Sequence, residues 1–149
     1  MRDFSSELVW VKIQMACTAL GGWLGYFLGG SDGLLIALIV FVALDYVTGV
    51  MCAIVDKELS SEVGFKGLFR KVLIFALVGV GHVVDTQVVG SGSALRTAVI
   101  CFYLSNEGLS VLENATHIGL PVPDRLKDIL SQLHNRSGKD ETGDSGDGE

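Results

Sequence analysis

The sequence predicts an all-α integral membrane protein with four transmembrane helices, and three observations support this fold class. First, 49% of the 149 residues are hydrophobic and another 19 are glycine, which exceeds the roughly 45–50% apolar share, glycine included, of soluble domains. Second, four apolar stretches of similar length follow one another with short polar connections. Third, lysine and arginine concentrate in alternate connections, the pattern of loops that stay in the cytoplasm.

Each apolar stretch has about the length needed to cross a bilayer. The expected spans are about 9–29, 33–55, 72–89 and 95–113. The first has no charged side chain from Ile13 to Ser31 and is the strongest candidate. The other three are each interrupted by ionisable side chains, namely Asp45 in the second, His82 and Asp85 in the third, and Arg96 and Glu107 in the fourth. Three spans is the alternative count.

The basic residues also predict the orientation of the chain. They occur before or early in the first span, in the 56–71 connection and after residue 124, whereas the two remaining loops offer only Arg96. Both termini are therefore expected in the cytoplasm, which requires an even number of spans. A cleaved signal peptide is the alternative for the first stretch, but the apolar run continues to Leu28 and exceeds signal length.

Several polar side chains are expected at membrane depth. They are Asp45, Thr48, His82, Asp85, Asn106, Glu107, Ser110, Glu113 and Asn114. Gly49, next to Thr48, adds a small residue at which another helix could approach closely. A carboxylate in the centre of a bilayer costs on the order of 2.5–3.5 kcal/mol, so these groups should face protein or water. Two interpretations stay open. The polar groups form a buried network that fixes helix packing, with Asp45 protonated or paired with His82, or they line a water-filled path once several copies associate.

The first stretch carries glycines at four-residue intervals, at Gly21, Gly25 and Gly29. This tandem small-residue pattern favours close helix packing, either within the monomer or between copies.

The C-terminal part differs in character from the transmembrane domain expected over 1–123. Pro121 and Pro123 end the fourth helix, and residues 124–137 show an amphipathic pattern with an apolar stripe that includes Leu126 and Leu130. We expect a cytoplasmic helix that rests on the membrane surface or on a neighbouring helix. The acidic segment 138–149 has no apolar residue and is expected to be disordered.

The sequence also excludes several classes of function. The formal net charge is −6 and the basic residues form no stripe, which argues against nucleic-acid binding. Three scattered cysteines exclude a disulfide framework. We find no catalytic motif and expect no enzyme, cofactor or metal, since the only conceivable acid pair, Asp45 with Asp85, differs in depth.

A series of short motifs from about residue 41 to 135 resembles the phage holin family that includes the toxin-secretion and phage-lysis holins of clostridia. The motifs are DYVTG at 45–49, KELSS at 57–61, GFKGL at 64–68 followed by Lys71, then Asp85, NEGLSVLEN at 106–114 and GLPVP at 119–123. The positions that match the family pattern but fall in the expected cytoplasmic loop are Ser60, Ser61, Gly67 and Lys71.

The resemblance implies a multi-pass protein of the bacterial, or host, cytoplasmic membrane that forms homo-oligomers within the lipid bilayer. It implies lesions that release a cell-wall hydrolase, the endolysin, or a toxin, and thereby host cell lysis. The acidic tail departs from the basic tail of many holins. Two other functions stay open, an antiholin or secretion accessory that regulates another pore, and a small-solute or ion carrier.

Overall fold

The computed structural model describes residues 4–139, which form helices and connections without any strand in that range. The helices are α1 (Phe4–Phe27), α2 (Gly33–Val55), α3 (Ser61–Val84) with a π-helical turn η1 (Asp85–Val89), α4 (Ala94–His117) and α5 (Asp124–Lys139). The expected all-α class is confirmed for these residues. Of the acidic segment 138–149, which we expected to be disordered, residues 140–149 lie outside the described residues, and residues 138 and 139 form the end of α5.

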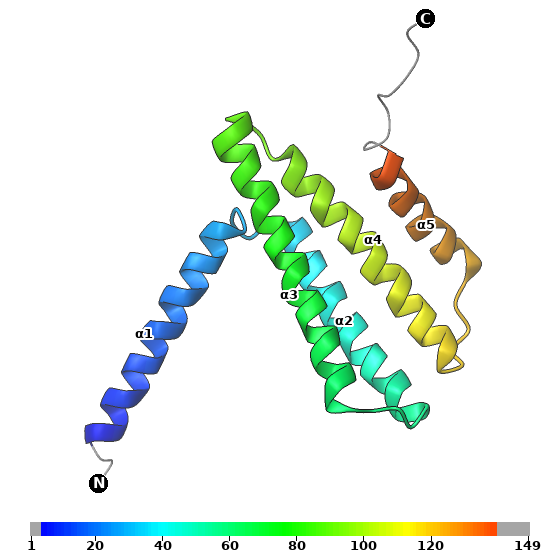
Figure 1. Cartoon of the computed structure of the whole chain (residues 1–149), viewed down its shortest axis with the longest axis horizontal. Coiled ribbons are helices and arrows are strands. Elements are labelled where there is room, and N and C mark those ends of the chain that lie inside the picture. The colour runs from blue at the N-terminus through cyan, green and yellow to red at the C-terminus, as the bar shows by residue number, and fades with distance from the viewer. Residues whose placement is uncertain (1–3, 140–149) are drawn as a thin grey trace, which may run out of the picture.

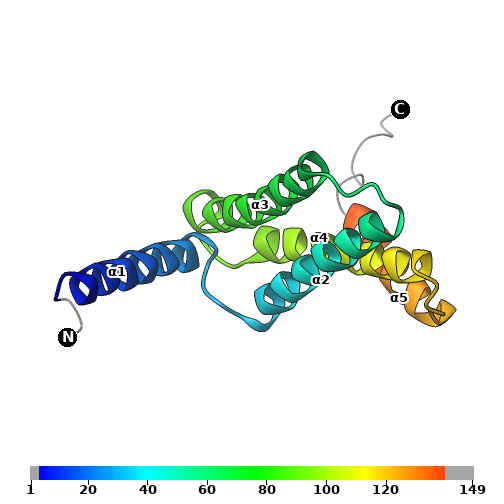
Figure 2. The ribbon, with the colours of Figure 1, turned by 90° about the horizontal axis from the view of Figure 1, so that it is seen from below.

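Helix α4 is the common neighbour of α2, α3 and α5, whereas α1 contacts α3. Helix α4 packs most extensively on α2, then on α5 and α3, whereas α2 and α3 meet each other over a small area. Figures 1 and 2 show α2, α3 and α4 as one bundle, with α5 folded back beside α4 and α1 extending away from them. Of the two positions that we expected for the amphipathic helix, the structure shows contact with a neighbouring helix, where Leu130 lies beside Gly108.

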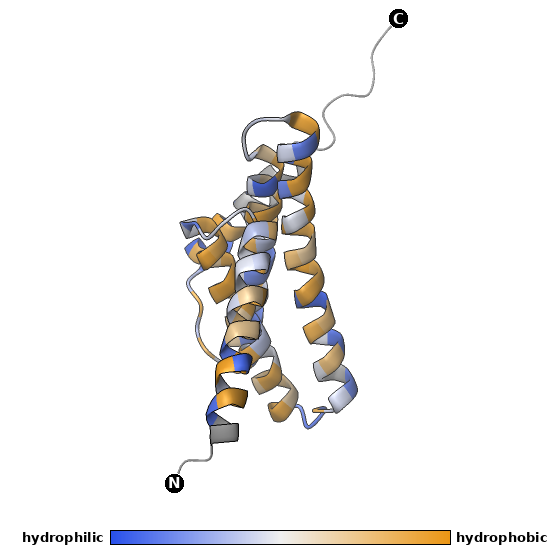
Figure 3. Ribbon diagram, turned by 90° about the vertical axis from the view of Figure 1, so that its left-hand side faces the viewer, coloured by the Kyte–Doolittle hydropathy of each residue, from blue (hydrophilic) through white to orange (hydrophobic). Residues whose placement is uncertain are grey.

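A small apolar core joins the three helices of the bundle. It consists of Leu35, Leu38, Val42, Ile74, Val78 and Ile100. Many large apolar side chains of the helices are instead exposed, and Figure 3 shows how far apolar residues extend along these helices. This arrangement is the reverse of a water-soluble domain, which buries its apolar stripe.

Two of the described helices are long and apolar enough to cross a bilayer, α2 and the Gly64–Val89 stretch of α3 with η1. Only 17% and 28% of their most apolar windows are buried, so neither resembles the core helix of a soluble protein. A membrane protein is the fold that these outward apolar surfaces support. Helices α1 and α4 do not meet the same criterion, because charged and polar side chains dilute their apolar content.

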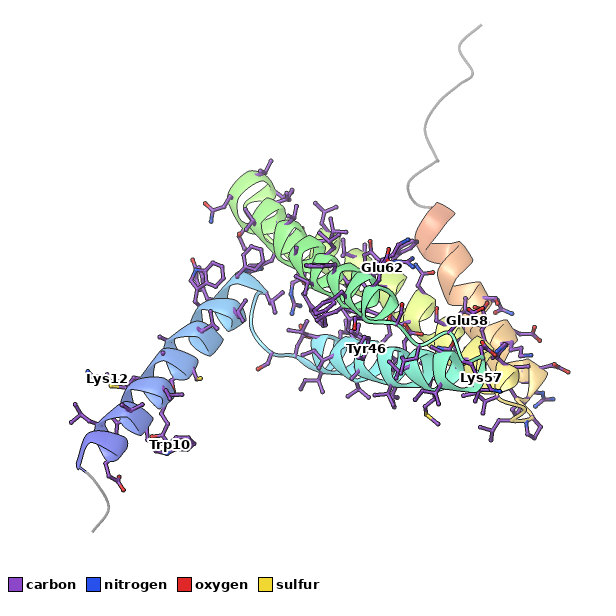
Figure 4. All side chains as sticks on the ribbon, turned by 60° about the horizontal axis from the view of Figure 1, so that its bottom comes forward. Trp10, Lys12, Tyr46, Lys57, Glu58 and Glu62 are labelled. Atoms are coloured by element: carbon purple, nitrogen blue, oxygen red, sulfur yellow. The ribbon has the colours of Figure 1, made fainter. Side chains whose placement is uncertain are left out.

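The third helix begins at Ser61 instead of about residue 72. The expectation had placed the whole basic stretch in a loop because of its charge, but nothing from 61 to 71 prevents helix formation, and the carbonyl of Ser60 accepts a hydrogen bond from Gly64 N at 3.1 Å. Gly67 and Lys71, expected in the cytoplasmic loop, therefore lie within α3, and Ser61 is its first residue. Tyr46 points from α2 towards α3 (Figure 4), where its ring lies close to Gly67.

The glycine pattern of the first helix is shorter than expected. Helix α1 ends at Phe27, and Gly29 and Gly30 follow with φ of +82° and +84°, a left-handed conformation that glycine adopts without the penalty of a Cβ. Gly29 thus belongs to a turn and does not share a helical face with Gly21 and Gly25. A Cβ at either of those two would meet nothing within 4 Å, so their face is open in the monomer.

Candidate functional site

A charged cluster joins the middle of the bundle. Lys71 Nζ of α3 donates to Asp45 Oδ2 of α2 at 2.5 Å and to Glu107 Oε2 of α4. The expectation that Asp45 pairs with His82 was therefore wrong. Because α2 and α3 are antiparallel, Lys71 lies opposite Asp45, while His82 is 11 residues further along α3, or about 16 Å along its axis.

Asn114, in the last turn of α4, completes the cluster. Its amide nitrogen donates to Asp45 Oδ1 at 3.1 Å and to Thr48 Oγ1 at 3.0 Å. Its backbone carbonyl accepts from Cys52 Sγ at 3.5 Å. Gly49 lies beside this contact, and a Cβ there would meet the Asn114 amide nitrogen at an ordinary van der Waals distance of 3.8 Å. The DYVTG motif and the second half of the NEGLSVLEN motif thus meet across the α2–α4 contact.

The cluster is largely shielded from solvent. The exposed fractions of the side chains are 15% for Lys71, 14% for Asp45 and 8% for Glu107. Asp45 and Glu107 lie near the middle of their helices. With two carboxylates and one ammonium group, the fully ionised cluster carries one net negative charge. Ions buried this deeply are tolerated only when they are paired and hydrogen-bonded, which the Lys71 bridge and the Asn114 amide provide.

The side chains of this cluster can form ion pairs with one another or bind water. Within the part of the chain that the structure describes, no group of three or more His, Cys, Asp or Glu side chains could hold a metal ion. The charges hold three helices together, and they can gain hydration if the helices separate.

His82 and Asp85 lie at the other end of the bundle. The carboxylate of Asp85, 1% exposed, accepts from the backbone N–H groups of Leu95 at 3.1 Å and Arg96 at 2.9 Å. It thus satisfies two amides in the first turn of α4, a capping role. His82 lies next to the turn at Gly29, where a Cβ would come within 2.6 Å of its Nδ1.

Arg96 forms a second polar group at this end, which we call the clasp. Its guanidinium donates to the carbonyls of Leu28 (2.6 Å) and Gly30 (3.1 Å) and pairs with Asp32 Oδ2 at 2.5 Å. Asp32 also caps α2 by accepting from Leu35 N at 2.8 Å. The hydrogen bond from Arg96, followed by that from the Leu35 amide, lowers the pKa of Asp32 below its usual value.

The sequence reasoning missed Lys71, Arg96 and Asp32 as partners of buried or capping groups. A signal was present for Lys71, since a carboxylate in the middle of an apolar helix requires a cation at the same depth. Counting back from the end of an antiparallel third helix would have identified it. Three other expected site residues, Asn106, Ser110 and Glu113, make no hydrogen bond to the cluster, but they line a groove between α3 and α4 that Asp45, Lys71 and Glu107 also line.

Comparison with known protein families decides the relationship. The model of the bacteriophage holin family matches residues 22–135. The chain belongs to this family. The match includes the charged cluster and the clasp but not the first three quarters of α1. The holin family is not an enzyme family.

Relatives of similar length support the same assignment. An uncharacterised protein of Listeria monocytogenes is 37% identical over 131 residues, covering 88% of this chain and 93% of the relative. A 14.9 kDa Clostridium perfringens protein is 38% identical over 124 residues, with coverages of 83% and 94%. A probable holin of Bacillus phage phi105 is 36% identical over 119 residues, with coverages of 77% and 87%. No solved structure matches this chain.

Proposed function

We propose that this chain is a lesion-forming holin of the bacterial cytoplasmic membrane. In this proposal it accumulates in the bilayer, associates with further copies and opens lesions through which a cell-wall hydrolase, the endolysin, or a toxin leaves the cytoplasm. Family membership, the phage relative named a probable holin and the outward apolar surfaces support it.

The observation that carries the proposal is the cluster of Asp45, Lys71 and Glu107 in the middle of an otherwise apolar bundle. Replacing a buried ion pair by apolar residues is often neutral or stabilising, so packing alone is a weak reason to place three charges there. A second, wetter arrangement of the same helices would rehydrate them. Because association depends on concentration, that arrangement is favoured once the density of the protein in the membrane is high.

The topology in this proposal has four spans, formed by α1, α2, α3 with η1, and α4, and both termini in the cytoplasm. Lys57 after α2, Lys66 in the first turns of α3 and the basic residues after Pro123 support this orientation. Residues 1–123 would form the transmembrane domain and 124–137 a cytoplasmic helix. Three spans is the alternative. Reporter fusions at the N-terminus and at the C-terminus distinguish the two counts, because four spans place both termini on the same side and three spans place them on opposite sides.

Expression of the chain alone in bacteria tests the function. A lesion-forming holin abruptly collapses the membrane potential and releases a folded cytoplasmic reporter enzyme. Selective uptake of a small solute without reporter release would instead identify a carrier. No effect alone, together with altered timing of a co-expressed holin, would identify an antiholin or secretion accessory. Either of these results would overturn the proposal.

A further inference from the structure

The polar face of α4 divides into two parts in the structure. Asn114 and His117 turn towards α2, where Asn114 bonds to Asp45 and His117 pairs with Asp56 at 2.9 Å. Asn106, Ser110 and Glu113 instead line a groove of about 670 Å³ between α3 and α4, and Glu113 also borders a second cavity that Lys127 of α5 lines. Among the residues that the structure describes, these three side chains have no hydrogen-bond or ion-pair partner.

The opposite wall of this α3–α4 groove carries an unpaired cation. Arg70 of α3 lines the groove, is exposed, and has no ionic partner within the described range. The groove therefore has a free guanidinium on one wall and the Glu113 carboxylate on the other, with the Ser110 hydroxyl between their two levels. The mutually paired charges of Asp45, Lys71 and Glu107 also line it. In a bilayer the unpaired groups need polar partners, because lipid chains supply none.

We propose that the partner is the same groove of a second copy of this chain. This inference rests on the proposed membrane function, and it names the surface through which copies associate. A two-fold axis parallel to the membrane normal makes the contact self-complementary. Arg70 of one copy then pairs with Glu113 of the other, twice per dimer, and charge complementarity favours a second copy over lipid.

The depths of the two charges agree with this pairing. Lys71 and Glu107 are in contact and mark one level of the bundle. From there Arg70 is one residue, and Glu113 six residues, towards the end of the bundle at which α3 begins and α4 ends, a difference of about 7–8 Å. The long stem of an arginine lets its guanidinium reach towards that end. Asn106 and Ser110 meet their own counterparts, since rotation about the normal leaves depth unchanged, and such side chains hydrogen-bond between helices in membranes.

Cysteine crosslinking tests the surface in native membranes. Cys17, Cys52 and Cys101 are replaced by alanine, Ser110→Cys is introduced, and copper phenanthroline supplies the oxidant. Val47→Cys, on the exposed apolar face of α2, is the matched control. We expect several-fold more disulfide-linked dimer from Ser110→Cys than from the control, because a disulfide requires Cα atoms within about 7 Å. Equal yields would overturn the proposal, and so would a thiol at position 110 that reacts with a membrane-impermeant reagent without forming dimers, which indicates a water-filled groove.

Charge exchange tests the pairing between copies. Arg70→Glu alone and Glu113→Arg alone each place like charges opposite one another in both contacts, and each should reduce the Ser110→Cys dimer several-fold. Co-expression of the two single variants should restore it as a mixed dimer, because both contacts again pair opposite charges. Absence of this recovery would overturn the pairing, since a contact within one copy is not repaired by a second variant chain.

The same cells report on the proposed function separately. Crosslinked dimers without reporter release would overturn the lesion-forming function and leave the interface intact. Reporter release with no enrichment of Ser110→Cys dimers would overturn the interface and leave the function intact.

Discussion

The two ionic groups of the bundle differ in depth and in what their charges bring together. The Lys71 cluster joins α2, α3 and α4 near the middle of the bundle, and both of its carboxylates are nearly buried. The Arg96 clasp holds the α1–α2 turn against the first turn of α4, and its carboxylate, Asp32, is 48% exposed.

This difference separates a group that organises the fold from one that can respond to water. In the clasp, the buried Arg96 guanidinium donates to two backbone carbonyls, and its ionic partner Asp32 is already half exposed to water. Opening the clasp would therefore add little hydration to its charged groups. The cluster removes three ionised groups from water in the apolar middle of the bundle, so opening it gains much more. The central cluster is accordingly the group whose release would accompany a rearrangement of the helices.

Removal of the central cation should have the largest effect on stability. Lys71→Met leaves Asp45 and Glu107 without a cation, and we expect a loss of about 3–5 kcal/mol in the free energy of unfolding. Denaturation of the purified protein in detergent micelles, followed by circular dichroism, measures it. Lys66→Met, at an exposed position of the same helix, should change stability by less than about 0.5 kcal/mol. Similar losses in both variants would contradict a special role for the cluster.

The clasp should be second in effect. Arg96→Leu leaves the Leu28 and Gly30 carbonyls without their donor and should lower the free energy of unfolding by about 1–3 kcal/mol. Arg96→Lys keeps a charge for Asp32 but loses the forked geometry, so its loss should be intermediate. If Arg96→Leu destabilised the protein as much as Lys71→Met, the contrast between the two groups would fail.

The docking of α1 should be third. A Cβ at Gly79 would lie 2.0 Å from a ring carbon of Phe27, so Gly79→Ala should displace the end of α1 and lower the free energy of unfolding by about 1 kcal/mol. In a Phe27→Ala background, Gly79→Ala should lower the free energy of unfolding by less than it does in the wild type, because the ring that the Cβ would meet is absent. Gly22→Ala, where a Cβ meets nothing within 4 Å, is the control and should cause no loss. Additive effects of Gly79→Ala and Phe27→Ala would contradict the contact.

Acid titration of the clasp should give the smallest effect. Because the pKa of Asp32 is lower in the folded protein than in the unfolded chain, its contribution to stability is complete above the ordinary aspartate pKa of about 4 and is lost as the pH falls through the folded value. Half exposure limits its size. The difference in stability between the wild type and Asp32→Asn should be constant from pH 7 to about 4.5 and shrink below that. A constant difference down to pH 2 would contradict the pKa direction.

The sequence predicted helices well where one helix was long and uniform. The second apolar stretch, expected over 33–55, coincides with α2, because Asp32 caps its start and the apolar run is nearly continuous. The start of the third helix was misplaced by about 11 residues, because its charged residues were interpreted as a loop. Lys71, one of these residues, lies inside the helix, where it neutralises the buried carboxylates of Asp45 and Glu107.

Contacts between helices were harder to predict than the helices themselves. Asn106, Glu107, Ser110, Glu113 and Asn114 were grouped along one polar surface, yet only Glu107 and Asn114 bond to residues of the cluster, while the other three line the groove without such bonds. That division depends on how α2 and α3 sit around α4, which periodicity along one helix does not encode. The roles of Gly29 and Asp85 likewise depend on distant partners.

The central claim is that the Asp45, Lys71 and Glu107 cluster separates a closed bundle from a lesion-forming state. The triple variant Asp45→Asn/Lys71→Met/Glu107→Gln removes the charges together and leaves no ion unpaired. At equal amounts in the membrane fraction, the time at which a cytoplasmic reporter is released measures the effect. The account predicts that release is delayed severalfold or abolished in the variant, because the closed bundle no longer has charges to rehydrate. Release at the wild-type time would contradict it.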